Sequence, residues 1–277
     1  MTSSRHWDGN SPRTFRDQLQ RTVTLAKAPE RIISLVPSQT ELLYTLGLEK
    51  EVAGITKFCV HPAAWFRSKT RVGGTKNVHA DIVRSLQPDL IIANKEENTA
   101  ADVEALMKDY PVWVSDIRTL EDALEMIAGV GAITCREAAA NALISDIQTQ
   151  FSALQPLTPP VPTAYFIWRN PWMVAGGDTF IRQMMQRCGL QNVFADMPRY
   201  PAITPEQLAG SGCRLVLLSS EPYPFKEKHI AELQEILPAA RILLVDGEMF
   251  SWYGSRLAEA VPYFRQLLDI PAFHFSR

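Results

Sequence analysis

Residues 31–47 read RIISLVPSQTELLYTLG and pass without interruption from a strand pattern to a helix pattern. The run RIISLV (31–36) is short, apolar and rich in β-branched residues, which predicts a buried strand. After Pro37, Ser38 begins the spacing of a capping box, and leucines then line one face of a helix that ends at Gly47. A buried strand that leads directly into a helix is typical of a parallel α/β sheet.

The same alternation continues along the rest of the chain. The predicted strands are residues 31–36, 52–56, 90–93, 112–115, 163–168, 215–219 and 242–245. The predicted helices are residues 38–46, 81–86, 100–108, 120–132, 178–188, 205–209, 230–237 and 255–268. Strands that alternate with helices in this way indicate parallel sheets.

One longer helix is predicted near the middle of the chain. No glycine or proline occurs from Thr134 to Leu154, and apolar residues recur there at helical spacing. Thr134 begins a second capping-box pattern at the start of this stretch. A helix of about 20 residues spans roughly 30 Å, the width of a small domain. The proline-rich segment LTPPVP (157–162) follows, which indicates a domain boundary.

The two halves of the chain have similar patterns. LIIANKE (90–96) in the first half matches LVLLSSE (215–221) in the second. We therefore expect an α/β fold with two similar lobes, although a chance match of short apolar strands is the alternative. The expected parts are an N-terminal lobe at 20–134, a connecting helix at 135–155 and a C-terminal lobe at 156–277.

The composition is ordinary for a folded, water-soluble protein. There are 28 basic and 30 acidic side chains, which give a net charge of −2, and 46% of the residues are hydrophobic. These values exclude disordered, collagenous and coiled-coil chains and give no general attraction to nucleic acid or anionic lipid. No apolar stretch approaches the roughly 18 residues of a membrane span. We expect a monomer that binds neither nucleic acid nor membranes.

The N-terminus and the cysteines bear on the compartment. The segment MTSSRHWDGNSPRTF (1–15) is polar and lacks the apolar core of a secretory signal. These residues alone therefore predict a cytoplasmic protein if this start is the natural one. Cys59, Cys135, Cys188 and Cys213 are spaced widely without a CxxC motif. Their spacing predicts four reduced, partly buried thiols.

Candidate binding residues follow the predicted strands, because ligands of open α/β sheets bind beyond the carboxyl ends of the strands. Aromatic faces in such loops suit a large, flat organic ligand, and Lys57, Lys95 and Arg169 suit its amide, carboxylate or phosphate groups. Trp65, Trp168, Trp172 and Trp252 are expected in or beside these loops rather than in the core. The candidate residues are Ser38, Lys57, Phe58, Cys59, His61, Asn94, Lys95, Glu96, Trp168, Arg169, Trp172, Glu221, Glu248, Phe250 and Trp252.

Cys59 and His61 are the candidates for contact with a metal. Thiolate and imidazole are ligands that cobalt, iron and zinc prefer, so either could become an axial ligand of a metal chelate. Two ligands without a third fit a packed cysteine beside a histidine in a tight loop better than a metal site, and both alternatives stay open. Among the other histidines, His229 is expected on a surface helix, and His274 in an aromatic tail that packs.

Standard catalytic motifs are absent. The sequence has no GxGxxG after a strand and no GxxxxGK[ST], GxSxG or HExxH motif. The alternative to a binding protein is an intracellular enzyme that uses the same loops for chemistry. Convergence of its polar groups within hydrogen-bond reach would favour catalysis, whereas an aromatic-walled slot would favour binding. The polar groups are Lys57, Cys59, His61, Glu96, Glu97 and Glu248.

Three segments of the chain resemble a known family. SLVPSQTELLYTLGL (34–48), LQPDLIIA (86–93) and GGDTFIRQMMQRCGLQNVF (176–194), together with the long central helix, are similar to the helical-backbone metal receptors. These are substrate-binding proteins of ABC importers for cobalamin, ferric siderophores and haem, and the chain looks closest to the cobalamin-binding members. The resemblance implies two Rossmann-like lobes with parallel sheets, joined by one long helix, and a ligand cleft between them. It also implies no intrinsic cofactor, a metal chelate as ligand, an ABC permease as partner and a periplasmic location.

The resemblance also suggests roles for single residues. Ser38, Phe58, Thr75, Asn94 and Trp168 fall where cobalamin-type members place ligand contacts. Thr75 and Asn94 are polar where those members have tryptophan, so a corrinoid, a ferric siderophore and haem all stay open as ligands. Family members also carry one surface acid per lobe that docks on arginines of the permease. Asp81 matches the first acid, and Glu248 lies close to the position expected for the second.

Overall fold

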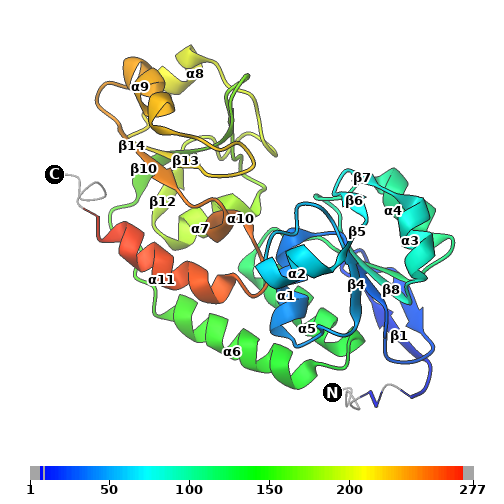
Figure 1. Cartoon of the computed structure of the whole chain (residues 1–277). Coiled ribbons are helices and arrows are strands. Elements are labelled where there is room, and N and C mark those ends of the chain that lie inside the picture. The colour runs from blue at the N-terminus through cyan, green and yellow to red at the C-terminus, as the bar shows by residue number, and fades with distance from the viewer. Residues whose placement is uncertain (1–6, 9, 271–277) are drawn as a thin grey trace. The chain divides into compact units, whose positions relative to one another are not determined.

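Two sheets, each in its own part of the chain, organise the fold (Figure 1). The structure is a computed structural model that describes residues 7–8 and 10–270. The tail around His274, which the sequence predicts to pack, lies outside these residues. We call the two compact parts unit 1 and unit 2. Unit 1 comprises Met1–Ile117, Glu121–Asp146 and Tyr253–Ser255, and unit 2 comprises Arg118–Leu120, Ile147–Trp252 and Arg256–Arg277.

Unit 1 is built on a five-stranded parallel sheet in the order β5-β4-β3-β8-β9. All residues of β3, β8 and β9 are buried, as expected for strands that are covered on both faces. Because β3 lies at the centre, the loops after β4 and β8 flank the start of helix α1 (Pro37–Thr45). The strands are β3 (Ile32–Ser34), β4 (Val52–Ile55), β5 (Thr70–Arg71), β8 (Leu90–Asn94) and β9 (Val112–Ser115).

Helices and two short antiparallel hairpins complete unit 1. Helices α3 and α4 pack against one face of the sheet, where Val83 and Leu106 join Ile33 and Ile91 in one hydrophobic cluster. The hairpins and α2 were not predicted, because elements this short show no hydrophobic period. The further elements are β1 (Arg13–Arg16), β2 (Thr22–Leu25), α2 (Ala63–Ser68), β6 (Gly73–Gly74), β7 (Asn77–Val78), α3 (Ala80–Leu86), α4 (Ala100–Met107) and α5 (Leu120–Ile133).

Unit 2 is built on a mixed five-stranded sheet in the order β11-β10-β13-β14, with β12 also paired to β10. Strand β11, which the sequence analysis does not predict, runs antiparallel to β10 at the edge of the otherwise parallel sheet. The reason is the short turn between them, since a parallel partner needs a long crossover connection. The strands are β10 (Val161–Trp168), β11 (Met173–Val174), β12 (Leu190–Asn192), β13 (Leu215–Ser219) and β14 (Arg241–Val245).

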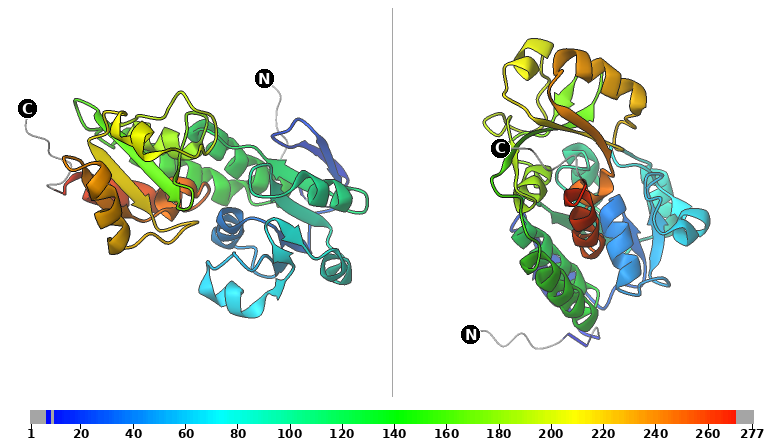
Figure 2. Two further views of the ribbon diagram at one scale, coloured as in Figure 1. Left: turned by 90° about the horizontal axis from the view of Figure 1, so that it is seen from above. Right: turned by 90° about the vertical axis from the view of Figure 1, so that its left-hand side faces the viewer.

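Five helices accompany the sheet of unit 2 in the described part of the chain, and Figure 2 shows both units from two further directions. Helix α10 occupies residues that the sequence predicts as a loop after the last strand. The core of the unit joins Phe166 and Val216 of the sheet to Leu233 of α9. The helices are α7 (Phe180–Arg187), α8 (Pro205–Ala209), α9 (Glu227–Ile236), α10 (Glu248–Ser251) and α11 (Leu257–Leu268).

A pair of glycines leads into α7 because another backbone segment passes directly beside it. The Gly176 and Gly177 N–H groups donate to the carbonyls of Arg199 and Met197, both at 2.8 Å. A Cβ atom on Gly177 would lie 1.8 Å from the Ala195 carbonyl oxygen. This close approach excludes any side chain at the position.

Helix α6 (Glu137–Ser152) lies where the long helix is predicted, and the division between the units falls inside it, after Asp146. The predicted α/β class is confirmed, with parallel strand pairs in both sheets. Of the helices in the described part of the chain, none combines the length and apolar character that crossing a membrane requires.

Both predicted capping boxes are wrong. Ser38 is the second residue of α1 rather than its cap, because Pro37 is already helical and Val36 is the cap residue, without a side-chain bond. The Thr134 hydroxyl donates to the Val130 carbonyl at 2.6 Å and so closes α5 instead of starting α6. The hydroxyl residues occur where a helix begins or ends, but the spacing alone does not show which end they serve.

Candidate functional site at the carboxyl ends of the strands

The loops that follow the strands of unit 1 contact one another at the carboxyl edge of the sheet. The Lys57 N–H donates to the Gly73 carbonyl at 2.8 Å. The Asn98 side chain donates to the carbonyls of Leu35, at 3.2 Å, and Thr75, at 3.0 Å. These bonds join the loops after β3, β4 and β8 to the β6–β7 hairpin, so the structure brings the unit 1 candidates together.

Phe58 presents an exposed aromatic ring at this edge. Its relative exposure is 51%, and the Lys57 Nζ atom lies 5.1 Å from the ring centroid. Gly74 packs behind the ring, where a Cβ atom would lie 3.2 Å from the Phe58 side chain. The ring is therefore supported from behind and offers a flat apolar face with a cation beside it.

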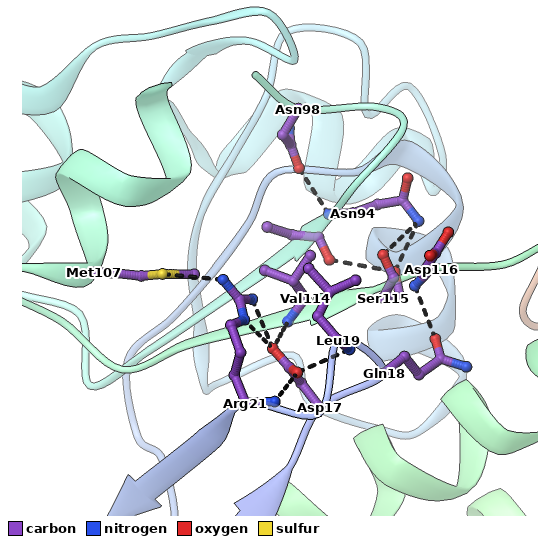
Figure 3. A network of polar contacts seen from close by, with 11 residues as sticks. Asp17, Gln18, Leu19, Arg21, Asn94, Asn98, Met107, Val114, Ser115 and Asp116 are labelled. Carbon is purple, nitrogen blue, oxygen red and sulfur yellow. Dashed lines mark hydrogen bonds and ion pairs between the residues drawn. The ribbon is translucent and has the colours of Figure 1, made fainter. Parts of the chain in front are cut away.

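Asn94 is a buried scaffold residue rather than an open ligand contact. Its side-chain NH₂ donates to the Ser115 hydroxyl at 2.9 Å and to the Ser115 carbonyl at 3.2 Å (Figure 3). Its side-chain oxygen accepts the N–H groups of Glu96, at 2.8 Å, and Glu97, at 3.0 Å. With 1% exposure, the amide is engaged within the protein and shapes the loop after β8.

Cys59 is sealed inside unit 1. The side chain has no exposed surface, and its sulfur lies 3.0 Å from the Thr40 hydroxyl and 3.1 Å from the Thr56 hydroxyl. Burial raises the pKa of the thiol, so Cys59 stays protonated at neutral pH. This geometry fits the packed-cysteine alternative. Among the described residues, no group of three or more His, Cys, Asp or Glu side chains is placed to hold a metal ion.

The four cysteines are free thiols, as the sequence predicts. His61 is half-buried just before α2. Ser38 and Thr75 are buried, with 4% and 9% exposure, so they offer little polar surface.

Charged groups surround the loop after β8. The Lys95 Nζ atom binds a carboxylate oxygen of Asp116 at 2.5 Å, and Lys76 donates to the Glu96 carbonyl at 2.5 Å. Burial, together with the neighbouring Glu96 carboxylate, raises the pKa of Glu97. Lysines and carboxylates therefore alternate around this edge, and Lys95 already has an acidic partner.

Trp168 presents an exposed aromatic ring at the end of β10 in unit 2. Its relative exposure is 40%, and it meets Tyr223 edge to face with 5.6 Å between the ring centroids. Arg169 beside it donates from Nε to Glu232 at 2.6 Å, and its guanidinium carbon lies 4.9 Å from the Trp172 ring centroid. The expected pattern of an aromatic face with a cation occurs here too, but the cation is paired with an acid.

Several residues predicted for the ligand loops lie in the interior instead. Trp65 and Phe250 have no exposed surface, and Trp252 has 7% exposure. Glu221 accepts hydrogen bonds from Ser251, at 2.6 Å, and from the Trp252 indole, at 2.9 Å, so it fastens α10. The predictions fail because these post-strand segments form helices α2 and α10, in which Trp65 and Phe250 face the core.

The two predicted docking acids differ in exposure. The Asp81 side chain is 95% exposed in the first turn of α3, where it pairs with Arg84 at 2.9 Å. The Glu248 side chain is 20% exposed and lies 3.4 Å from Arg256, which is itself 9% exposed. A carboxylate held in this way is not a free surface acid, so Glu248 is wrong as a docking residue.

Glu206 is an exposed acid whose position in unit 2 resembles that of Asp81 in unit 1, and it was not among the predicted residues. It is the second residue of α8, just as Asp81 is the second residue of α3. Both helices precede the strand that pairs with the first strand of their sheet, β8 in unit 1 and β13 in unit 2. The signal was present in Thr204-Pro205-Glu206, but it was not matched to His79-Ala80-Asp81.

The catalytic alternative finds little support in this geometry. Of its six polar groups, Cys59 has a sealed, protonated thiol and Glu248 is paired with Arg256. A nucleophile needs access to a substrate, and the Cys59 thiol does not have it.

A hollow of about 460 Å³ lies on unit 2, away from the aromatic edge. Its lining includes Pro160, Arg182, Gln186 and Gln191. Strand β12, beside it, pairs with the first residues of β10, at the opposite end from Trp168. The hollow is therefore separate from the loops described above.

Comparison with known proteins identifies relatives that match most of the chain. Residues 32–235 match the family described as "Periplasmic binding protein". The chain is similar to the "Uncharacterized ABC transporter substrate-binding lipoprotein YvrC" of Bacillus subtilis (strain 168), with 28% identity over 208 residues. That match covers 71% of this chain and 66% of the relative, just under two thirds of its length.

Two further proteins cover more of the chain. The "Vitamin B12-binding protein" of Pectobacterium carotovorum subsp. carotovorum (strain PC1) is 24% identical over 239 residues, which covers 83% of this chain and 84% of the relative. The solved structure of the periplasmic catecholate-siderophore binding protein VctP from Vibrio cholerae superposes with a TM-score of 0.77 at 14% identity. It covers 92% of this chain and 100% of that one, which shows a shared fold.

Proposed function

Because this chain belongs to the periplasmic binding protein family, we propose that it binds a corrinoid or a similar metal chelate and delivers it to an ABC importer. A relative named for vitamin B12 binding, similar over most of both chains, supports the corrinoid. A second relative, named as an ABC transporter substrate-binding lipoprotein, supports the importer. The family name also supports a working place in the periplasm.

The observation that carries this proposal is an exposed aromatic ring at the carboxyl edge of each sheet. Phe58 in unit 1 and Trp168 in unit 2 keep 51% and 40% exposure. Complete burial of an exposed apolar side chain contributes about 1.5–3 kcal/mol, so burying the half of such a ring that remains exposed contributes about 1 kcal/mol. The rings stand where ligands of α/β sheets bind, which favours a ligand with broad apolar faces.

Polar groups beside the rings would bind the edge of the chelate. We assign this role first to Lys57, whose ammonium lies beside the Phe58 ring. Lys95 and Arg169 already bind Asp116 and Glu232, so either would have to exchange an acid for the ligand. Ferric siderophores and haem are the alternative ligands, since both also combine a large chelate with polar or charged edges.

We assign docking on the permease to Asp81 and Glu206. Both are exposed acids at the second position of equivalent helices. A hydrogen bond with the Thr204 side chain lowers the pKa of Glu206, so this residue stays anionic at neutral pH. Two fixed anions suit arginines on a partner surface.

Isothermal titration calorimetry with cyanocobalamin, haem and a ferric siderophore tests the proposal, and it avoids the light absorption of these ligands. We expect one of the three to bind at micromolar concentration or below. Phe58→Ala and Trp168→Ala should each weaken that binding about tenfold, or roughly 1.4 kcal/mol, because each removes one apolar contact face.

Tyr44→Ala is the matched control. Tyr44 is 46% exposed in the last turn of α1, at the end of the helix that lies away from the candidate loops. Its removal should leave the affinity unchanged. Absence of binding by all three chelates would contradict the proposed function, and so would equal losses in Tyr44→Ala and Phe58→Ala.

A further inference from the structure

An aromatic cluster in unit 2 supports the exposed ring of Trp168 from behind. Tyr223 meets Trp168 edge to face at 5.6 Å and lies 4.8 Å from the Phe225 ring. Tyr223 is itself half-buried, so the residue keeps some accessible surface while its ring contacts Trp168. The two rings together present a wider aromatic surface than Trp168 alone.

A histidine is buried inside this cluster, although the sequence predicts it on a surface helix. His229 has 2% exposure and stacks edge to face against Tyr223, at 5.4 Å, and Phe225, at 5.3 Å. It is the third residue of α9 and faces back towards the loop that carries Tyr223. The prediction is wrong because the side chain serves as a helix cap.

The two ring nitrogens of His229 have different partners. Nδ1 accepts the Lys226 N–H at 2.9 Å, so this nitrogen carries no proton. The proton of the neutral ring is then on Nε2, which lies 3.2 Å from the Tyr223 hydroxyl oxygen and donates to it. His229 thus takes the place of the glutamate in a capping box and at the same time holds Tyr223.

We propose that Tyr223 is a ligand-contacting ring beside Trp168, and that His229 is the positioning residue that holds this pair of rings while its imidazole is neutral. The proposal rests on the proposed function for its ligand, but the positioning role concerns unit 2 alone. It adds two residues that neither the sequence motifs nor the exposed rings had indicated.

Protonation of His229 would place an N–H on Nδ1 opposite the Lys226 N–H. Two donors would then face each other in a buried site, and the cap would be lost. The charged groups around the ring are Glu232 and Lys228 on α9 and Arg169 after β10. Glu232, the acid that could stabilise an imidazolium, already binds Arg169 at 2.6 Å.

Burial is the largest cause that lowers the pKa of His229. A lowered pKa in the folded state means that the neutral ring contributes stability above the unfolded value of about 6.5. This contribution is lost as the pH falls through the lower folded value. The arrangement of Tyr223 and Trp168 should therefore be stable at pH 8 and loosen as the pH falls through the lowered pKa of His229.

Fluorine NMR of the full chain labelled with 5-fluorotryptophan tests the positioning role without any ligand. The Trp168 resonance, assigned with Trp168→Phe, should shift and broaden between pH 8 and pH 5. His229→Gln keeps a side-chain acceptor for the cap but does not titrate, so it should abolish this response. His79→Gln, which changes an exposed histidine in unit 1, should keep it. A pH-independent Trp168 resonance in the unmutated protein, or an unaltered response in His229→Gln, would overturn the positioning role.

Calorimetry with the chelate that binds the unmutated protein tests the ligand contact. At pH 8, Tyr223→Ala should weaken binding about tenfold, and the unmutated protein should bind at least threefold more weakly at pH 5.5. Unchanged affinity in Tyr223→Ala would overturn this inference and leave the proposed function intact. Absence of binding by all three chelates would overturn the proposed function and with it the contact of Tyr223, while the fluorine experiment would still decide the role of His229.

Discussion

Phe58 and Cys59 are neighbours in the chain, but one side chain is exposed and the other is sealed. Phe58 keeps 51% exposure, whereas the Cys59 sulfur lies between the hydroxyls of Thr40 and Thr56 with no exposed surface. The chain turns at Lys57 and Phe58, and the Cys59 N–H donates to the Thr56 carbonyl at 3.2 Å. The loop after β4 therefore offers an aromatic face to a ligand and anchors itself with the thiol.

Cys59→Ala tests whether the buried thiol anchors the loop without contacting the ligand. The variant should lose about 1 kcal/mol of unfolding free energy, because it removes two hydrogen bonds of a buried group. The affinity for hydroxocobalamin, or for haem if haem is the ligand, should be unchanged within twofold. The visible spectrum of the bound chelate should not shift, since a sealed thiol does not reach the metal. A shifted spectrum in Cys59→Ala, with His61→Ala as comparison, would show that the thiol is an axial ligand.

Strand ends and the N-terminal hairpin together hold the loop after β8. Asp17, at the end of β1, has a fully buried carboxylate that accepts the Val114 N–H at 3.3 Å and binds Arg21 at 2.6 Å (Figure 3). Ser115, the next residue of β9, binds the Asn94 side chain. This continuous network fixes β9 against the hairpin and the loop against β9, so the loop is positioned before any ligand arrives.

The acids at the starts of helices α3 and α8 are expected to dock on the permease. Asp81→Arg and Glu206→Arg should each remove most of the ATPase stimulation measured with a cobalamin ABC importer reconstituted in liposomes, because each reverses a docking charge. Chelate affinity should be unchanged, since both acids lie on helices outside the candidate loops. Glu30→Arg is the control, because the Glu30 side chain is 67% exposed and pairs with Lys27 near the N-terminus of the described chain. Full stimulation by both α3 and α8 variants would contradict the docking assignment.

The longer elements of the fold are predictable from the sequence because burial gives them a regular hydrophobic period. Strands such as 112–115 and 215–219 agree with β9 and β13 to the residue. The short helices α2 and α10 show no such period. Trp65 and Phe250 were therefore expected in loops, whereas both are buried in the core. Local propensity does not reveal which side of a single helical turn faces the core.

The candidate site is predictable to the level of loops but not of atoms. The rule that ligands bind at the carboxyl ends of strands identified the loops of Phe58 and Trp168, whose rings are exposed. The Asn94 side chain binds Ser115, and the Glu248 carboxylate lies beside Arg256. No pattern in the sequence links the two residues of either pair. Hydrogen bonds between loops depend on tertiary structure, so sequence reasoning could not separate scaffold residues from contact residues.

For the whole molecule, we propose that ligand binding takes place at the carboxyl edges of both sheets and not elsewhere in the part of the chain that the structure describes. The claim concerns the loops around residues 57–61 and 94–98 of unit 1, and residues 168–172 and 220–225 of unit 2. The hollow beside Arg182 and Gln186 is the competing location, because it has the volume to hold a small molecule.

Hydrogen–deuterium exchange of the full chain, with and without cyanocobalamin or whichever chelate calorimetry selects, tests this claim most directly. We expect the ligand to slow amide hydrogen exchange in the loops that carry Phe58 and Trp168, in both units, and to leave exchange around Arg182 unchanged. Protection confined to the segment 182–195, or protection of one unit's loops without the other's, would contradict it.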